Sequence, residues 1–122
     1  MGEADAEIDF DHLNQYVGGD VALTHEVFGL FKNQVDMLGN KLDPHSPDEV
    51  WEAVTHSLKG TARAIGAVRL ADLCQTAEDL VGDAKRPGAR DVIARKIEDG
   101  ISQAMIEIQR WEYRQTLNKM RS

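Results

Sequence analysis

Three residues in the stretch HSLKGTARAIGA, residues 56–67, have types and a spacing that suit phosphoryl chemistry. His56 offers an imidazole, which is available as a neutral nucleophile near neutral pH because its unperturbed pKa is about 6.5. Lys59 follows one helical turn later, and its ammonium can neutralise phosphoryl oxygens carried on the outer ring nitrogen. Gly60 lacks a side chain, so another protein's active site can approach the ring. The alternative is an exposed histidine with an incidental lysine beside it.

Gly60 needs an explanation because glycine inside a helix costs roughly 1 kcal/mol relative to alanine. On a helical wheel, His56 projects roughly 180° away from the apolar residues of its own segment. Lys59, Gly60 and Arg63 fall within about 60° of His56 on the same wheel. The wheel therefore predicts that these four residues share one exposed face, with Gly60 as a flat spot beside the imidazole.

The elements that position these residues are predicted to be helices, because no strand pattern occurs in the sequence. A short helix over residues 10–17 ends at the sequence GGD, and Asp20 can cap the next helix. The sequence SPDE at residues 46–49 has a capping hydroxyl, a proline at the first helical position and a glutamate at the third. A third helix therefore begins near Pro47, and we expect Gly66 to end it.

Apolar residues recur every three or four positions in each long segment, which is typical of a helix with one buried face. The second and third helices carry Leu23, Val27, Leu30 or Phe31, Val35, Leu38 and Leu42, then Val50, Trp51, Val54, Leu58, Ala62 and Ile65. The last two carry Leu70, Leu73, Cys74, Ala77, Leu80 and Val81, then Ile93, Ile97, Ile101, Ala104, Ile108 and Trp111. Short linkers make neighbouring helices antiparallel. The predicted fold is all-α, an antiparallel four-helix bundle with a short additional N-terminal helix.

The bulk composition fits one domain, with residues 1–7 as an acidic N-terminal tail and residues 8–122 as the helical bundle. No run approaches the roughly 18 apolar residues of a membrane span, and no signal peptide is recognisable. Cys74 is the single cysteine and cannot form an internal disulfide. We therefore expect a cytoplasmic protein that does not bind membranes. Its scattered histidines have no paired-ligand spacing, so we expect no metal site.

The charge distribution bears on the class of partner. A formal net charge of −7 opposes binding to nucleic acid. Between Glu52 and Leu70, however, the basic side chains of Lys59, Arg63 and Arg69 outnumber a single acid. This local excess favours an acidic or phosphorylated partner, and the alternative is a solvated face with a chance excess of positive charge.

The stretch HSLKGTARAIGAVRLADLCQTAE resembles the signature of the histidine-containing phosphotransfer (Hpt) domain family. The matching positions are His56, Leu58, Lys59, Gly60, Gly66, Ala67, Leu70, Cys74 and Glu78. Upstream, VGGDVALTHEVFGLF resembles the first-helix segment of that family, so the resemblance spans about residues 10–80. Thr55 and Ala77 depart mildly from the usual pattern.

The resemblance implies a role for each matching site residue. His56 is the expected phosphoacceptor, Lys59 the residue that stabilises the phosphoryl group, and Gly60 the gap that admits a receiver domain. Glu78 matches a position that in some members hydrogen-bonds the inner imidazole nitrogen, although a surface carboxylate is the alternative. Arg63 and its neighbour Ala64 are expected to contact the partner.

The resemblance also implies a phosphorelay intermediate, monomeric and without kinase activity of its own. Its partners would be response-regulator receiver domains and a hybrid sensor histidine kinase. No nucleotide-binding motif is visible, so we expect no cofactor on this chain, and Mg²⁺ in the partner receiver. The alternative function is a helical adaptor or kinase-docking domain that binds signalling partners without phosphotransfer.

Overall fold

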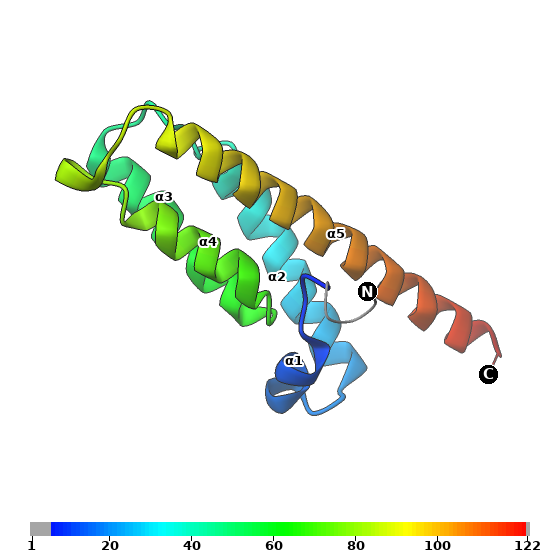
Figure 1. Cartoon of the computed structure of the whole chain (residues 1–122). Helices are drawn as coiled ribbons and strands as arrows, with labels where there is room; N and C mark the ends of the chain where they lie inside the picture. Colours follow the sequence, from blue (N-terminus) through cyan, green and yellow to red (C-terminus); the bar gives the residue numbers. More distant parts are fainter. Residues whose placement is uncertain (1–5, 122) are drawn as a thin grey trace.

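The computed structural model describes residues 6–121, which contain five α-helices, one short 3₁₀ turn and no strand. The helices are α1 (Phe10–Val17), α2 (Val21–Gly39), α3 (Asp48–Ala64), α4 (Val68–Glu78) and α5 (Ala89–Arg121), and the 3₁₀ turn is Gly82–Ala84. Helices α2 to α5 lie side by side and alternate in direction, while α1 lies at one end (Figure 1). The predicted antiparallel four-helix bundle with an additional N-terminal helix is confirmed.

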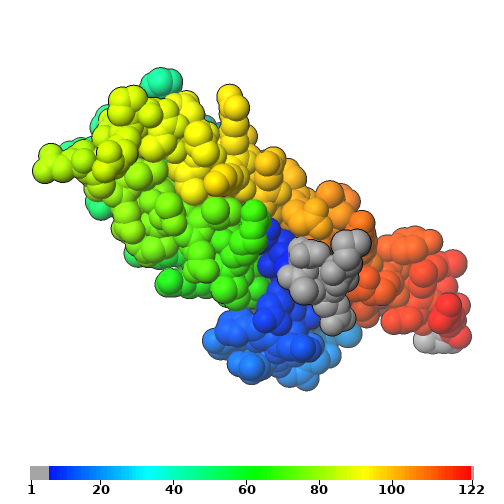
Figure 2. Space-filling model, in the orientation of Figure 1, coloured from blue at the N-terminus to red at the C-terminus, as the bar shows by residue number. Residues whose placement is uncertain are grey.

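Helix α5 is the longest element, with 33 residues, and its C-terminal end projects past the other helices (Figure 2). No helix within residues 6–121 has the combination of length and apolar content that crossing a membrane requires.

The helix starts agree only in part with the sequence. Asp20 caps α2 as predicted, because its Oδ1 accepts a hydrogen bond from the backbone N–H of Leu23 at 3.0 Å. The predicted cap of α3 by Ser46 is wrong. Pro47 is the N-cap residue, and no side chain there accepts a hydrogen bond from the helix. Two acidic residues in the first turn of α3 are instead favoured by the helix dipole.

Gly66 ends the histidine-bearing helix α3, as predicted. Its φ of +74° is a left-handed conformation, and the next N–H, of Ala67, donates to the carbonyl of Ala62 at 2.9 Å. The backbone N–H of Asp9 also donates to the carbonyl of Gly66 at 2.9 Å. A Cβ at position 66 would meet the carbonyl oxygen of Asp9 at 2.8 Å. The glycine therefore both turns the chain and admits the N-terminal segment.

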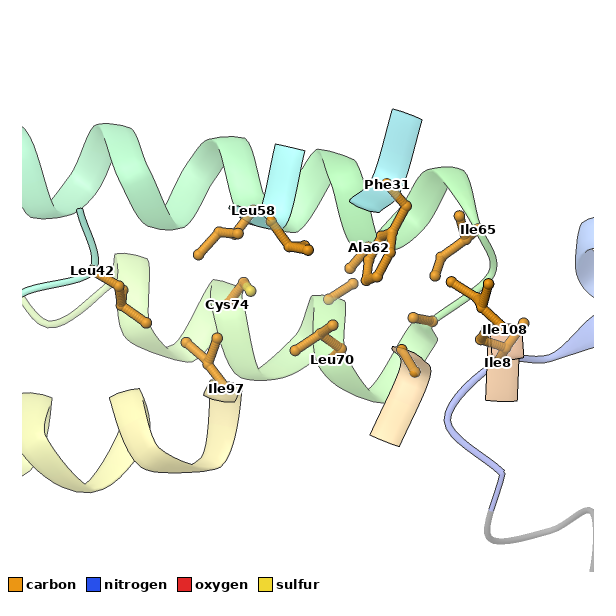
Figure 3. Close-up of a cluster of buried hydrophobic side chains, with 14 of the residues drawn as sticks. Ile8, Phe31, Leu42, Leu58, Ala62, Ile65, Leu70, Cys74, Ile97 and Ile108 are labelled. Carbon is orange, nitrogen blue, oxygen red and sulfur yellow. The ribbon is translucent and has the colours of Figure 1, made fainter. Parts of the chain in front are cut away.

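One hydrophobic core runs through the bundle, with side chains from all four long helices (Figure 3). Trp51 and Trp111 are both buried in it, as predicted. Burial raises the pKa of the Cys74 thiol to about 12, so this cysteine is a core residue and a poor nucleophile at neutral pH. Leu23 and Val50 were expected in the core but are exposed. Each lies in the first turn of its helix, near an end of the bundle.

A buried arginine joins the two loops at one end of the bundle. Arg90, in the first turn of α5, lies over the ring of Trp51, with its guanidinium carbon 4.8 Å from the ring centroid. It donates hydrogen bonds to the carbonyls of Leu80 (2.9 Å) and Ser46 (3.0 Å) and to the carboxylate of Asp48 (2.7 Å). The loops before α3 and after α4 are therefore held together beside Trp51.

The N-terminal segment is bound to the bundle by two buried glutamates. On α5, the carboxylate of Glu107 accepts hydrogen bonds from the backbone N–H groups of Glu7 (2.8 Å) and Ile8 (2.7 Å). The carboxylate of Glu7 accepts from the backbone N–H of Leu70, in the first turn of α4, at 3.0 Å. The N-cap residue of α4 is Ala67, which has no side-chain acceptor, so Glu7 caps α4 from outside the helix.

These contacts correct the predicted N-terminal boundary. Glu7 was expected in a solvated acidic tail, but it is 5% exposed and part of the bundle. The sequence gives no sign of this burial because the partners of Glu7 lie on distant helices. Residues 1–5 of the predicted tail lie outside the described residues.

Candidate functional site

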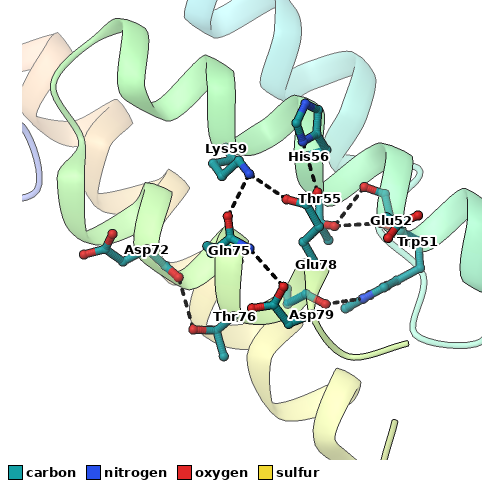
Figure 4. Close-up of polar contacts among 11 residues, drawn as sticks. Trp51, Glu52, Thr55, His56, Lys59, Asp72, Gln75, Thr76, Glu78 and Asp79 are labelled. Carbon is teal, nitrogen blue, oxygen red and sulfur yellow. Dashed lines mark hydrogen bonds and ion pairs between the residues drawn. The ribbon is translucent and has the colours of Figure 1, made fainter. Parts of the chain in front are cut away.

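Helices α3 and α4 bring together the polar residues of the candidate site (Figure 4). His56 lies midway along α3, and Glu78 is the last residue of α4. Glu78 Oε2 lies 3.0 Å from His56 Nδ1, and Glu78 Oε1 lies 2.8 Å from Lys59 Nζ. One carboxylate therefore contacts both residues of the predicted His-Lys pair.

The contact with Glu78 determines which nitrogen of His56 carries the proton. Hydrogen bonds from Lys59 and His56 hold the pKa of Glu78 below its ordinary value of 4.5. The carboxylate is therefore ionised at neutral pH and can only accept hydrogen bonds. Nδ1 of the neutral ring must be the donor, which leaves the lone pair on Nε2. The His56 side chain is 66% exposed, so this lone pair is accessible to a partner.

Lys59 does not lie on the exposed face that the helical wheel predicts. Its side chain is only 11% exposed, because α4 packs along this flank of α3. The ammonium donates to Glu78 Oε1 and to Gln75 Oε1, each at 2.8 Å. The wheel fails here because it treats α3 alone. The ammonium therefore belongs to a buried polar cluster behind the imidazole.

Gln75 is a member of this cluster that the sequence did not indicate. It lies one turn before Glu78 on α4, and such a spacing places both side chains on the same face. Its Nε2 donates to the carboxylate of Asp79 at 2.9 Å, while its Oε1 accepts from Lys59. The spacing from Glu78 is the one signal by which it could have been found.

On its other flank, His56 borders an open groove between α2 and α3. The groove is lined by Val27, Leu30, Phe31, Gln34, His56, Ser57, Gly60, Thr61 and Ala64. A Cβ added at Gly60 would have no neighbour within 4 Å, so the missing side chain leaves open space beside the ring. The flat spot expected from the sequence is therefore present.

Most of the chain is similar to a known protein family. The model of the Hpt domain family matches residues 24–111, which is well over half of the chain. The chain belongs to the Hpt domain family. The resemblance to that family is thus confirmed.

A solved structure is also similar to this Hpt domain over nearly its whole length. The crystal structure of the histidine phosphotransferase ShpA from Caulobacter crescentus matches with a TM-score of 0.75 and 25% sequence identity. The match covers 94% of this chain and 99% of that chain. A search of curated proteins gave no match.

Two further predicted site residues of the Hpt domain, Arg63 and Ala64, are adjacent on α3, and one of them lines the groove. Ala64 lines the groove, whereas Arg63 is exposed on α3 but is not a lining residue. The contribution of α2 was missed, although the adjacent pair Leu30 and Phe31 held a clue. Adjacent residues of a helix point about 100° apart, so the more central of the two faces the core and the other lies at its edge. Phe31 faces the core, and Leu30 is 63% exposed in the groove.

Two of the other three histidines of the Hpt domain pack against aromatic rings elsewhere. The ring of His25 packs edge-on against Trp111, with 4.8 Å between centroids, and His12 packs against Tyr16 at 5.4 Å. Within residues 6–121, no group of three or more His, Cys, Asp or Glu side chains could hold a metal ion.

Proposed function

We propose that this Hpt domain is a phosphorelay intermediate that carries a phosphoryl group on Nε2 of His56. It accepts the group from a receiver-domain aspartate, or directly from a kinase, and passes it to another receiver domain. The observation that carries the proposal is the 3.0 Å contact between His56 Nδ1 and Glu78, which leaves Nε2 as an exposed nucleophile. Membership of the Hpt family and similarity to a histidine phosphotransferase support the same role.

The transfer from a receiver is a displacement at phosphorus. The Nε2 lone pair of His56 forms the new P–N bond, the bond between phosphorus and the aspartate oxygen breaks, and the aspartate leaves as a carboxylate. The ring gains positive charge in this step, and the ionised Glu78 at Nδ1–H stabilises that charge. Lys59 supplies a positive charge behind the ring for the phosphoryl oxygens. The reverse displacement delivers the group to the next receiver.

The groove between α2 and α3 suits the docking of a receiver domain. Small residues, Gly60 and Ala64, give access to the ring, and the exposed Leu30 offers apolar contact area. In this proposal Arg63, which is exposed on α3, meets an acidic surface of the partner. In this proposal the Mg²⁺ belongs to the receiver, and the chain is a stoichiometric, monomeric carrier in the cytoplasm.

A test that needs no cognate partner uses phosphoramidate, a small phosphoryl donor. We expect one acid-labile, base-stable phosphoryl group on the wild-type protein and none on His56→Gln. His45→Gln is the matched control, because it removes another exposed histidine, and it should be labelled like the wild type.

The same variants are then incubated with a receiver domain phosphorylated by a hybrid histidine kinase. Transfer to the wild type, and not to His56→Gln, is the expected result. Equal labelling of His56→Gln, or no labelling of the wild type by either donor, would overturn the proposal. Partner binding without labelling would indicate the adaptor or kinase-docking function instead.

A further inference from the structure

We propose that Gln75 is a positioning residue for phosphoryl transfer, which acts by holding the ammonium of Lys59 behind His56. The inference rests on the proposed function, because it assigns to Lys59 a role in stabilising the phosphoryl group. Gln75 touches neither His56 nor a phosphoryl group on Nε2. Its effect on the reaction therefore passes through Lys59.

The burial of Lys59 makes its acceptors important. An ammonium has three N–H donors, and at 11% exposure water cannot satisfy them all. Gln75 and Glu78 accept two of them at 2.8 Å each. Among the described residues these are its two hydrogen-bond acceptors, which leaves the third N–H for a phosphoryl oxygen.

Glu78 alone cannot hold Lys59 firmly, because its carboxylate is shared. One oxygen accepts from the ammonium and the other from the imidazole of His56. When the ring gains positive charge during transfer, the attraction between Glu78 and the ring grows. Gln75 makes no hydrogen bond to the ring, so the acceptor that it offers to Lys59 is not shared with His56.

Asp79 fixes the orientation of the Gln75 amide. A carboxylate accepts and does not donate, so the amide nitrogen must face Asp79, where the separation is 2.9 Å. The amide oxygen then faces Lys59. Lys59 therefore donates to Gln75, and Gln75 donates to Asp79. Neither hydrogen bond can run in the opposite direction, because an ammonium only donates and a carboxylate only accepts.

The first test is a double-mutant cycle on transfer from a phosphorylated receiver. Gln75→Leu removes the acceptor, and we expect transfer about tenfold slower, as for a lost hydrogen bond to a charged group. In a Lys59→Met background the same change should have no further effect, because the group on which Gln75 acts is gone. The matched control is Thr76→Val, an exposed neighbour on α4, which should transfer at the wild-type rate.

The second test reverses the direction of the hydrogen bond between the side chains at positions 75 and 79. Gln75→Glu combined with Asp79→Asn keeps an acceptor for Lys59 and a hydrogen bond to position 79. We expect this pair to restore transfer to within about twofold of the wild type. Gln75→Glu alone should not restore transfer, because it places the new carboxylate in contact with that of Asp79.

A third measurement is independent of activity. The buried Lys59 ammonium should give a slowly exchanging ¹⁵N–¹H signal in the wild type that is lost in Gln75→Leu. The inference would be overturned if Gln75→Leu transferred at the wild-type rate. It would also be overturned if Gln75→Leu slowed transfer as much in the Lys59→Met background as in the wild type. If the wild type is never labelled, the proposed function fails instead, while the ammonium signal still reports whether Gln75 holds Lys59.

Discussion

Trp51 on α3 donates its indole N–H to the backbone carbonyl of Ala77 at 2.6 Å, one residue before Glu78. The indole is buried beneath the guanidinium of Arg90. Trp51 and His56 lie on the same helix, so this hydrogen bond fixes the end of α4 relative to the imidazole. The contact between Glu78 and His56 depends on that registration.

Trp51→Phe should therefore weaken the contact between Glu78 and His56 as well as destabilise the core. The change keeps an aromatic ring but removes the indole N–H, and we expect a loss of about 1–2 kcal/mol in the free energy of unfolding. In ¹⁵N spectra of the imidazole, the fraction of His56 protonated on Nδ1 should fall. Trp111→Phe, in the same core, should cost stability without changing the tautomer. An unchanged tautomer in Trp51→Phe would contradict the registration role.

Glu78→Gln should slow phosphoryl transfer at least tenfold, because a neutral amide stabilises neither the developing ring charge nor one fixed tautomer. The measurement is the rate of transfer from a phosphorylated receiver. Asp72→Asn, which neutralises an exposed acid on the same helix, is the control and should leave the rate unchanged. Equal rates for wild type and Glu78→Gln would remove Glu78 from the mechanism.

The lowered pKa of Glu78 predicts a dependence of stability on pH. Because its folded pKa lies below the ordinary 4.5, the unfolded chain binds this proton more readily. The stabilisation is then fully present above pH 4.5 and is lost as the pH falls through the folded pKa. Denaturant unfolding of wild type and Glu78→Gln should show a stability gap that narrows below pH 4.5. A gap that is constant with pH would contradict the assignment.

Substitutions at Gly60 should distinguish the access of a partner to His56 from the stability of the fold. Gly60→Ala should raise the free energy of unfolding by about 0.5–1 kcal/mol, because helix propensity improves and the Cβ meets no neighbour. Gly60→Gln should slow transfer from a receiver domain but not labelling by phosphoramidate, which is small enough to reach the ring. Gly29→Gln on α2, also without a neighbour within 4 Å, is the matched control. If Gly60→Gln slowed labelling by phosphoramidate as much as transfer from the receiver domain, the substitution would have damaged the site rather than blocked access to it.

Glu7→Ala should destabilise the domain by about 1–2 kcal/mol, because α4 loses its external cap. Thermal or urea unfolding measures the loss. Glu26→Ala, which removes an exposed glutamate from α2, should change stability much less. Equal effects of the two changes would show that the cap contributes nothing specific.

The order of the helices, the exposure of His56 and the gap at Gly60 could be predicted because each depends on periodicity within one segment. The burial of Lys59 could not, since it depends on how α4 lies against α3. Charged residues were the hardest to place. Glu7 and Arg90 look like solvated positions in the sequence, and their burial depends on partners far along the chain.

The polar cluster lies on the α4 side of α3, and the groove lies on the α2 side. Among residues 6–121, His56 is the single side chain that belongs to both. The polar cluster therefore draws its other members from one flank of α3, and the groove draws its lining from the opposite flank and from α2. In the proposed function, substitutions at Leu30 and Gln34, which line the groove and have no part in the polar cluster, should change the choice of receiver and leave the transfer step intact.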